Sequence, residues 1–279
     1  GRKAYWWSRF YKYLNSNGNV YLKLDMDFRS CELYDDNMKE RSIFKKCTDI
    51  VDIVSVESES VKNKIQKYSA KNLLVIRDGL AELDCKPLIN MHRNNTFITV
   101  ARLGTVQKAT DILLEAFAKS SNLHSWKLLL VGNIEEDFKP YINEYFQKYP
   151  MLVDRVIFAG MIMDRKELYD RYCTSKVFVL PSRWESYGIA AIEALNCGCH
   201  LLLSDSIPPA NEMINNGKYG SIVKSGDIDD LAEKIVEMTK KEYDQNEIND
   251  LVDYVKNEFS WDRICNKLFV AMNKVNEKD

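Results

Sequence analysis

Residues 177–198, VFVLPSRWESYGIAAIEALNCG, decide the fold class of this chain. A short apolar run, typical of a strand buried on both faces, stops at Pro181, and a helix is predicted to begin near Gly188. The first amides of a helix have no partner within it, so this junction is suited to bind a phosphate. Glu185 in the loop and Glu193 in the helix can reach different ends of one extended ligand.

The same alternation of strand and helix runs through the chain. Continuous apolar runs predict strands at 20–24, 50–56, 73–76, 96–100, 127–131, 156–159, 177–180 and 200–203. Apolar residues at intervals of three and four predict helices at 111–118, 166–173, 190–195 and 231–240. Alternation of this kind indicates βαβ units and a parallel sheet, which is the α/β class. We predict a partial Rossmann-like domain at 1–80, a linker at 81–95 and a complete Rossmann-like domain at 96–279.

The composition excludes several classes of protein. Of 279 residues 46% are hydrophobic and the net charge is -2, which excludes a disordered chain, and 11 Gly with 6 Pro exclude a collagen-like one. Because 39 Lys and Arg balance 41 Asp and Glu, we expect no nucleic-acid partner. The 7 cysteines, none spaced as Cys-x-x-Cys, indicate reduced thiols rather than a zinc site. No apolar run is long enough to span a membrane, and no signal peptide opens the chain, so we predict a cytoplasmic protein.

A second segment supplies positive charge. In ITVARLGTVQKATDILLEAF, residues 98–117, a strand ends near Arg102, and a helix begins after Lys108 with Asp111 in its first turn. The two cations lie on either side of one loop. They can stabilise negative charge that develops on a phosphate oxygen when a sugar–phosphate bond breaks.

Together the two segments resemble the retaining family-four glycosyltransferases with the GT-B fold, in which two glutamates are separated by seven residues, as Glu185 and Glu193 are. Ala101 and Ala109 stand where that family has glycine. Further segments match the family in order and spacing: LLLVGN at 128–133, VIFAGMI at 156–162, Glu212, and FSWDRI at 259–264.

The resemblance implies transfer of a sugar from a UDP- or GDP-linked donor to a glycan or lipid-linked acceptor, with retention of anomeric configuration. It implies catalytic roles for Arg102, Lys108 and Glu185, and no metal or cofactor. Donor-binding residues would be Gly132, Met161, Ser186, Tyr187, Gly188, Ile189 and Glu193. Glu193 would hold the ribose hydroxyls and Glu185 would contact the transferred sugar.

Two other functions stay open: an accessory or degenerate subunit that binds a catalytic partner, and a nucleotide-sugar epimerase of the same fold. An epimerase would need more acid–base residues around the sugar than Glu185. Asp25-Met26-Asp27 resembles the Asp-x-Asp metal motif of the other large glycosyltransferase fold. This tripeptide is very common, and Arg102 and Lys108 would make a metal unnecessary.

The first domain departs from the family pattern. Its early glycine-rich loop is absent, and Lys23-Leu24-Asp25 stands where the family commonly has a histidine. We therefore expect a truncated piece of a longer enzyme, a proteolytic fragment, or one subunit of a split enzyme. The opening GRKAYWWSRFYKY, residues 1–13, is basic and aromatic. We predict a helix inside the first domain, with contact at the inner face of a membrane as the alternative.

Overall fold

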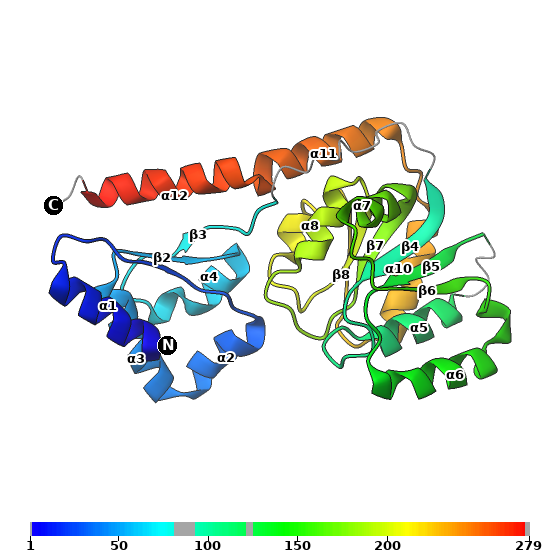
Figure 1. Ribbon diagram of the computed structural model, residues 1–279, viewed down its shortest axis with the longest axis horizontal. Coiled ribbons are helices and arrows are strands. Elements are labelled where there is room, and N and C mark those ends of the chain that lie inside the picture. The colour runs from blue at the N-terminus through cyan, green and yellow to red at the C-terminus, as the bar shows by residue number, and fades with distance from the viewer. Residues whose placement is uncertain (1, 81–92, 121–124, 277–279) are drawn as a thin grey trace. The chain divides into compact units, whose positions relative to one another are not determined.

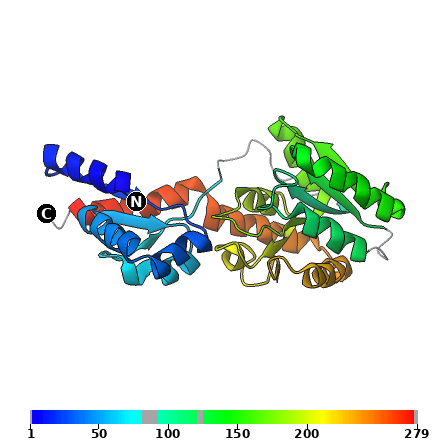
Figure 2. The same cartoon turned by 90° about the horizontal axis from the view of Figure 1, so that it is seen from below.

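The computed structural model describes residues 2–80, 93–120 and 125–276, which form two compact units (Figures 1 and 2). Unit 1 joins the chain up to residue 80 with the segment from Phe259 onward, and unit 2 covers the described residues from 93 to 258. Each unit has a parallel sheet with helices packed against it. The predicted α/β class is confirmed.

Unit 1 contains a three-stranded sheet in the order β1-β2-β3. Its strands are β1 (Tyr21–Lys23), β2 (Ile53–Val56) and β3 (Leu74–Val75), and its helices are α1 (Arg2–Leu14), α2 (Phe28–Asp36), α3 (Met38–Ile50), α4 (Glu59–Ile65) and α12 (Trp261–Asn276). Helix α4 packs on β2 and β3 and buries Val61 and Ile65. The strand predicted at 50–56 is shorter than expected, because Ile50 ends α3 and the ladder starts at Ile53.

The aromatic opening segment forms helix α1, as predicted. Ser8 is buried, α1 packs on α3, and Lys12 pairs with Asp52 at 2.7 Å. Large aromatic side chains on the same helix are exposed, among them Trp6 at 64% and Trp7 at 70%. Helix α1 therefore packs on α3 but leaves its large aromatic side chains mostly exposed, whereas the sequence had suggested that its aromatic face would be packed.

The C-terminal segment differs from the prediction that residues 96–279 form one domain. Residues from Phe259 onward belong to unit 1. The Leu80 amide donates to the Phe259 carbonyl at 2.8 Å, and the Arg77 guanidinium lies 5.5 Å from the centre of the Phe259 ring. Gly79 lies against Trp261, where there is no room for a Cβ atom. Of the predicted linker, 81–92 lies outside the described residues, and 94–95 begin a strand.

Unit 2 contains a six-stranded parallel sheet in the order β6-β5-β4-β7-β8-β9. The strands are β4 (Asn94–Val100), β5 (Lys127–Val131), β6 (Val156–Gly160), β7 (Ser175–Leu180), β8 (His200–Ser204) and β9 (Gly220–Val223). The helices are α5 (Thr110–Lys119), α6 (Lys139–Lys148), α7 (Arg165–Thr174), α8 (Ile189–Asn196), α9 (Ala210–Met213), α10 (Ile228–Lys240) and α11 (Gln245–Phe259). Figure 1 shows α5, α6 and α10 on one face of this sheet and α7 and α8 on the other.

Alternating side chains of the central strands fill two cores. Val177 and Val179 of β7 pack with Phe97 of β4 in the cluster that includes α5 and α10. Phe178, between them, points to the opposite face and contacts Tyr172 of α7, with ring centroids 6.0 Å apart. Burial on both faces explains why these strands read as continuous apolar runs. The central strands are thereby fixed, and their carboxyl ends hold the loops described next.

Candidate functional site

The candidate site lies where β4 and β7 end. The chain proceeds outward from β4 through β5 to β6 and then returns to β7 beside β4. Connections leave the adjacent ends of β4 and β7 in opposite directions, so this is the topological switch point, where open α/β sheets bind ligands. The loop at 101–109 follows β4, and the loop at 181–188 follows β7.

Helix α8 begins at Ile189, directly after Gly188, as predicted. Gly188 has φ 94°, in the left-handed region that glycine adopts without strain, and it gives the helix no side-chain cap. The Ala191 amide donates to the Gly188 carbonyl at 2.9 Å, and the amides that precede it at the start of α8 are suited to bind an anion. Tyr187 is buried, so only its backbone can face a ligand, whereas Ile189 is exposed.

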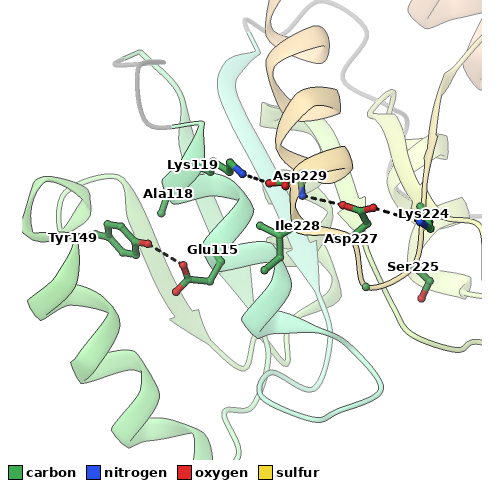
Figure 3. A pocket seen from close by; sticks show the side chains of 10 residues that line it. Glu115, Ala118, Lys119, Tyr149, Lys224, Ser225, Asp227, Ile228 and Asp229 are labelled. Atoms are coloured by element: carbon green, nitrogen blue, oxygen red, sulfur yellow. Dashed lines mark hydrogen bonds and ion pairs between the residues drawn. The ribbon is translucent and has the colours of Figure 1, made fainter.

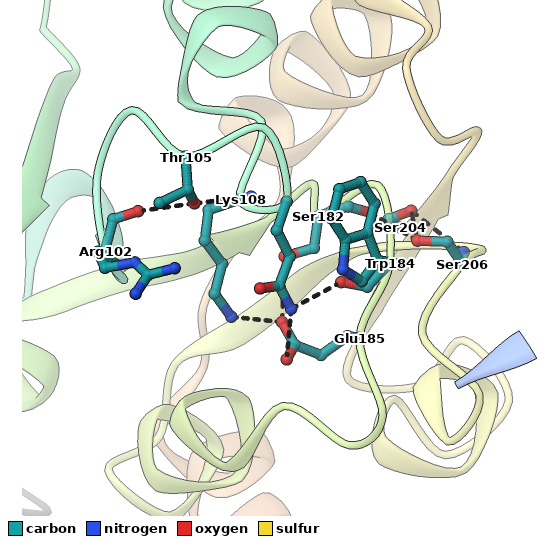
Figure 4. Close-up of polar contacts among 9 residues, drawn as sticks. Arg102, Thr105, Lys108, Ser182, Trp184, Glu185, Ser204 and Ser206 are labelled. Carbon is teal, nitrogen blue, oxygen red and sulfur yellow. Dashed lines mark hydrogen bonds and ion pairs between the residues drawn. The ribbon is translucent and has the colours of Figure 1, made fainter. Parts of the chain in front are cut away.

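Lys108 and Glu185 meet at this edge of the sheet (Figure 4). The Lys108 ammonium forms an ion pair with Glu185 Oε2, to which the Ser182 hydroxyl donates at 3.3 Å. Gln107 Nε2 approaches Glu185 Oε1 at 3.5 Å and donates to the Trp184 carbonyl at 3.2 Å. The structure thus joins two residues that the sequence placed on separate segments.

Arg102 is also paired, although the sequence suggested a cation free to meet phosphate. Its Nε lies 3.3 Å from Glu135 Oε1, and its side chain is 66% exposed. Both predicted cations are therefore balanced by carboxylates in this structure. An incoming anion would either share these cations with the carboxylates or displace the carboxylates from them.

Glu193 points to a different set of partners. Arg165 Nη2 lies 3.1 Å from Glu193 Oε1 and also donates to the Tyr169 hydroxyl at 3.1 Å. Burial raises the pKa of Glu193, and the Arg165 guanidinium opposes that rise. Glu185 and Glu193 are consequently paired with different cations, Glu185 with Lys108 and Glu193 with Arg165. Nothing in the local pattern around Arg165 had marked it as part of the site.

The neighbouring strand ends hold the remaining predicted residues. Gly132 follows β5 with φ 139°, and its amide donates to the Gly160 carbonyl at 2.8 Å. A Cβ atom at Gly132 would overlap the carbonyl oxygen of Ala101, so the close approach of these backbones requires glycine. Met161 follows β6 and is exposed, and Ser186 is half-buried in the loop before α8.

Serine side chains support the loop after β7. Ser206 Oγ donates to the Ser182 carbonyl at 2.5 Å and contacts Ser204 Oγ at 2.8 Å (Figure 4). Ser182 and Ser204 are buried. This chain of contacts joins the end of β8 to the loop that carries Glu185. The sequence analysis did not single out these serines.

Two cavities of unit 2 contain none of the predicted site residues. One of about 620 Å³ lies beside α5 and the start of α10 (Figure 3). Its polar side chains already bind one another: Lys119 pairs with Asp229, and the Tyr149 hydroxyl donates to Glu115 at 2.8 Å. The other, of about 760 Å³, lies at the amino ends of β4, β5 and β7. Neither cavity is the candidate site.

No group of three or more His, Cys, Asp or Glu side chains among the described residues could hold a metal ion. In the Asp25-Met26-Asp27 motif, Asp27 accepts from the Ser30 amide at 2.7 Å as the N-cap of α2 and pairs with Arg29 at 2.8 Å. It therefore already has a structural role. No helix in the described part of the chain is long and apolar enough to cross a membrane.

Comparisons with known proteins agree with this architecture. The model of the family described as Glycosyl transferases group 1 matches residues 86–257. An uncharacterized glycosyltransferase, MJ1178 of Methanocaldococcus jannaschii, is 23% identical over 242 residues, which cover 87% of this chain and 64% of that protein. The lipopolysaccharide core biosynthesis mannosyltransferase LpcC of Rhizobium leguminosarum is 28% identical over 132 residues, which cover 46% of this chain and 36% of that protein. The chain thus spans less than two thirds of these relatives.

A solved structure has the same fold. Anabaena HepE, determined in complex with UDP, superposes with a TM-score of 0.74 at 16% identity, covering 98% of this chain and 76% of that one. At this identity the likeness shows the fold alone. The comparisons do not favour the epimerase or accessory-subunit alternatives.

Proposed function

Because this chain belongs to the glycosyl transferases group 1 family and has the GT-B fold, we propose that it transfers a sugar from a nucleotide-sugar donor to an acceptor with retention of configuration. One observation carries the proposal. The paired Lys108 and Glu185 lie at the switch point of the sheet, in the loops that precede α5 and the uncapped start of α8. A nucleoside diphosphate needs cations and free amides of this kind.

The proposed chemistry requires no protein base. The bond between the sugar C1 and the leaving phosphate oxygen breaks, and a bond between C1 and the acceptor oxygen forms on the same face. The acceptor hydroxyl gives its proton to the leaving phosphate. Arg102, Lys108 and the first amides of α8 would stabilise the charge on that phosphate, each by about 2.7 to 4 kcal/mol at the transition state.

The two glutamates would divide the donor between them. We propose that Glu193 holds the ribose hydroxyls and that Glu185 contacts the transferred sugar. Their separate partners, Arg165 for Glu193 and Lys108 for Glu185, support this division. No metal or cofactor is part of the proposal.

Binding of a nucleoside diphosphate tests the proposal directly. We expect UDP or GDP to bind in a calorimetric titration and Arg102→Ala to weaken that binding. Arg171→Ala is a matched control, because Arg171 is an exposed arginine of the same unit whose ion pair, in the part of the chain that the structure describes, is with Glu167 of its own helix at 3.3 Å. No binding by either nucleotide, or equal effects of the two variants, would refute the proposal.

The glutamates can be tested separately. Glu193→Ala should weaken binding of the free nucleoside diphosphate, because it removes the proposed ribose contact. Glu185→Ala should chiefly impair discrimination between sugars. Titration of each variant with a nucleotide and with the matching nucleotide sugar measures both effects, and equal losses toward the free nucleotide would contradict the division of roles.

We further propose a glycan or lipid-linked acceptor and peripheral contact with the inner face of a membrane through α1. Exposed Trp6, Trp7 and Phe10 share this helix with the exposed cations Lys3 and Arg9. Aromatic rings and cations on one helix suit an anionic lipid surface. LpcC, by its name a mannosyltransferase of lipopolysaccharide core biosynthesis, is in keeping with such an acceptor.

Vesicle binding measures this contact. The double variant Trp6→Ser with Trp7→Ser should lose sedimentation with vesicles of phosphatidylcholine and phosphatidylserine. Met38→Ser on α3, which also removes an exposed apolar side chain, should keep it. Equal sedimentation of all three proteins would exclude α1 as the contact.

A further inference from the structure

Arg183 and Asp111 connect the two loops of the candidate site. Arg183 lies in the loop after β7, and Asp111 lies in the first turn of α5, after the loop that follows β4. Arg183 Nη2 lies 2.7 Å from Asp111 Oδ2 and Nη1 lies 3.2 Å from Oδ1, so the guanidinium binds the carboxylate through two parallel bonds. Such a bidentate pair fixes orientation as well as distance.

The same arginine also binds the backbone of the facing loop. Its Nη1 donates to the Val106 carbonyl at 2.8 Å, and its own amide donates to the Gln107 carbonyl at 2.8 Å. In return, Gln107 Nε2 donates to the carbonyl of Trp184, the residue after Arg183. These contacts lie beyond the last paired residues of the β4–β7 ladder, Ile98 and Phe178. They take the place of ladder hydrogen bonds where the strands have ended.

Lys108 and Glu185 lie directly beside these contacts in sequence. Gln107 precedes Lys108, and Trp184 precedes Glu185. A displacement of either loop would therefore move the ammonium away from the carboxylate. The side chains of Arg183 and Asp111 are 28% and 37% exposed, so solvent screens part of their attraction, and the fixed geometry of the two bonds is what they supply to the loops.

We propose that Arg183 and Asp111 are a positioning pair that holds Lys108 and Glu185 in register for sugar transfer. This inference rests on the proposed function. Neither residue touches the donor in this scheme. They act by fixing the distance between the cation that meets the leaving phosphate and the carboxylate that meets the sugar, a distance to which transfer is sensitive, since a misplacement of about 1 Å can cost about 100-fold in rate.

The variants are Arg183→Met and Asp111→Asn, which keep side-chain size and remove the ion pair. Arg171→Met is the control, because it removes an ion pair from the exposed surface of α7 in the same unit. Arg183→Lys keeps the charge but cannot make two parallel bonds to Asp111. We expect it to restore only part of what Arg183→Met loses.

Hydrogen exchange of the protein without substrate is the first measurement. Peptides covering 105–108 and 182–187 should exchange about fivefold faster in Arg183→Met and Asp111→Asn, and peptides of α10 should not change. Unchanged exchange in both loops would overturn the positioning role, whether or not the chain transfers sugar. The control should exchange like the parent protein in these peptides.

Kinetics of sugar transfer are the second measurement. We expect kcat to fall by about 100-fold in both variants, with smaller changes in the KM for the donor and in the dissociation constant of the nucleoside diphosphate. A purely structural role would lower activity only in proportion to the folded fraction, and kcat equal to that of the control would overturn the inference. Failure of the parent protein to bind any nucleoside diphosphate would instead refute the proposed function.

Discussion

A buried arginine joins the ends of two helices in unit 2, and its replacement should be costly. Arg93, which directly precedes β4, is 8% exposed. Its Nη1 donates to the carbonyl of Ser175, the C-cap of α7, at 2.8 Å, and its Nη2 donates to the carbonyl of Cys197, the C-cap of α8, at 2.5 Å. A cation at two helix C-termini is favourable because their last carbonyls have no helical partner.

The expected loss follows from these contacts. Arg93→Met keeps an apolar stem but removes two hydrogen bonds from a charged donor, each worth about 1.5 to 3 kcal/mol. Partial repacking around methionine offsets some of this, so we expect a loss of about 3 kcal/mol in the free energy of unfolding of unit 2. For a unit of this size that corresponds to a fall in Tm of about 6 to 12 °C.

Thermal and urea unfolding of the parent protein and three variants tests this reasoning. Arg171→Met removes an exposed guanidinium with a partner four residues away, and should cost only about 0.3 to 0.5 kcal/mol. Arg93→Lys keeps a charge near both carbonyls and should fall between the other two variants. Equal midpoints for Arg93→Met and Arg171→Met would refute the role of Arg93 at the helix ends.

Other predictions concern single residues. Glu57 is 1% exposed and has no hydrogen-bond partner among the described residues, and burial, with a smaller contribution from Asp25, raises its pKa to about 7. The folded state then binds the proton more tightly than the unfolded state, so stability falls as pH rises from the usual carboxyl range toward 7. Glu57→Gln should therefore raise the Tm of unit 1 at pH 8 relative to the parent, and this gain should shrink as pH falls and vanish at about pH 4, below the usual carboxyl value of 4.5; equal gains at pH 8 and pH 4 would contradict it. Gly132→Ala should prevent unit 2 from folding, because its Cβ would overlap the Ala101 carbonyl. Gly217→Ala, also at a positive φ but with open space around it, should lose only about 1 to 2 kcal/mol, and similar circular dichroism melts for the two glycine variants would show the steric argument to be wrong.

Buried strands were the most predictable part of the fold. The run at 127–131 coincides with β5, because burial on both faces leaves an uninterrupted apolar pattern. The edge strand β9 was not predicted, since its four residues, Gly220–Val223, are mostly only half-buried and show no such run. The early start predicted for β2 has a related cause, because Ile50 at the end of α3 continues the apolar run of the strand.

The residue types of the candidate site were predictable from the sequence, but most of their partners were not. The start of α8 at Ile189 follows from a local pattern of strand, loop and glycine. Arg165 is 28 positions from Glu193, and Arg183 is 72 positions from Asp111. No local periodicity relates such pairs, because the sheet order brings them together. The sequence therefore predicted which cations and carboxylates lie at this edge of the sheet but not which cation balances which carboxylate.

The order of the strands in unit 2 has a consequence for folding kinetics. Phe97 on β4 pairs with Val177 on β7, and two complete strand–helix repeats lie between these strands in the chain. The central β4–β7 pairing therefore requires closure of a long loop. Closure of so long a loop is slow. Lys108 and Glu185 meet only after that step, so the candidate site is assembled late. If the proposed function holds, the nucleoside diphosphate that this chain binds, UDP or GDP, should leave the folding rate unchanged when added during refolding and should slow unfolding, as a ligand does when it binds only the finished unit.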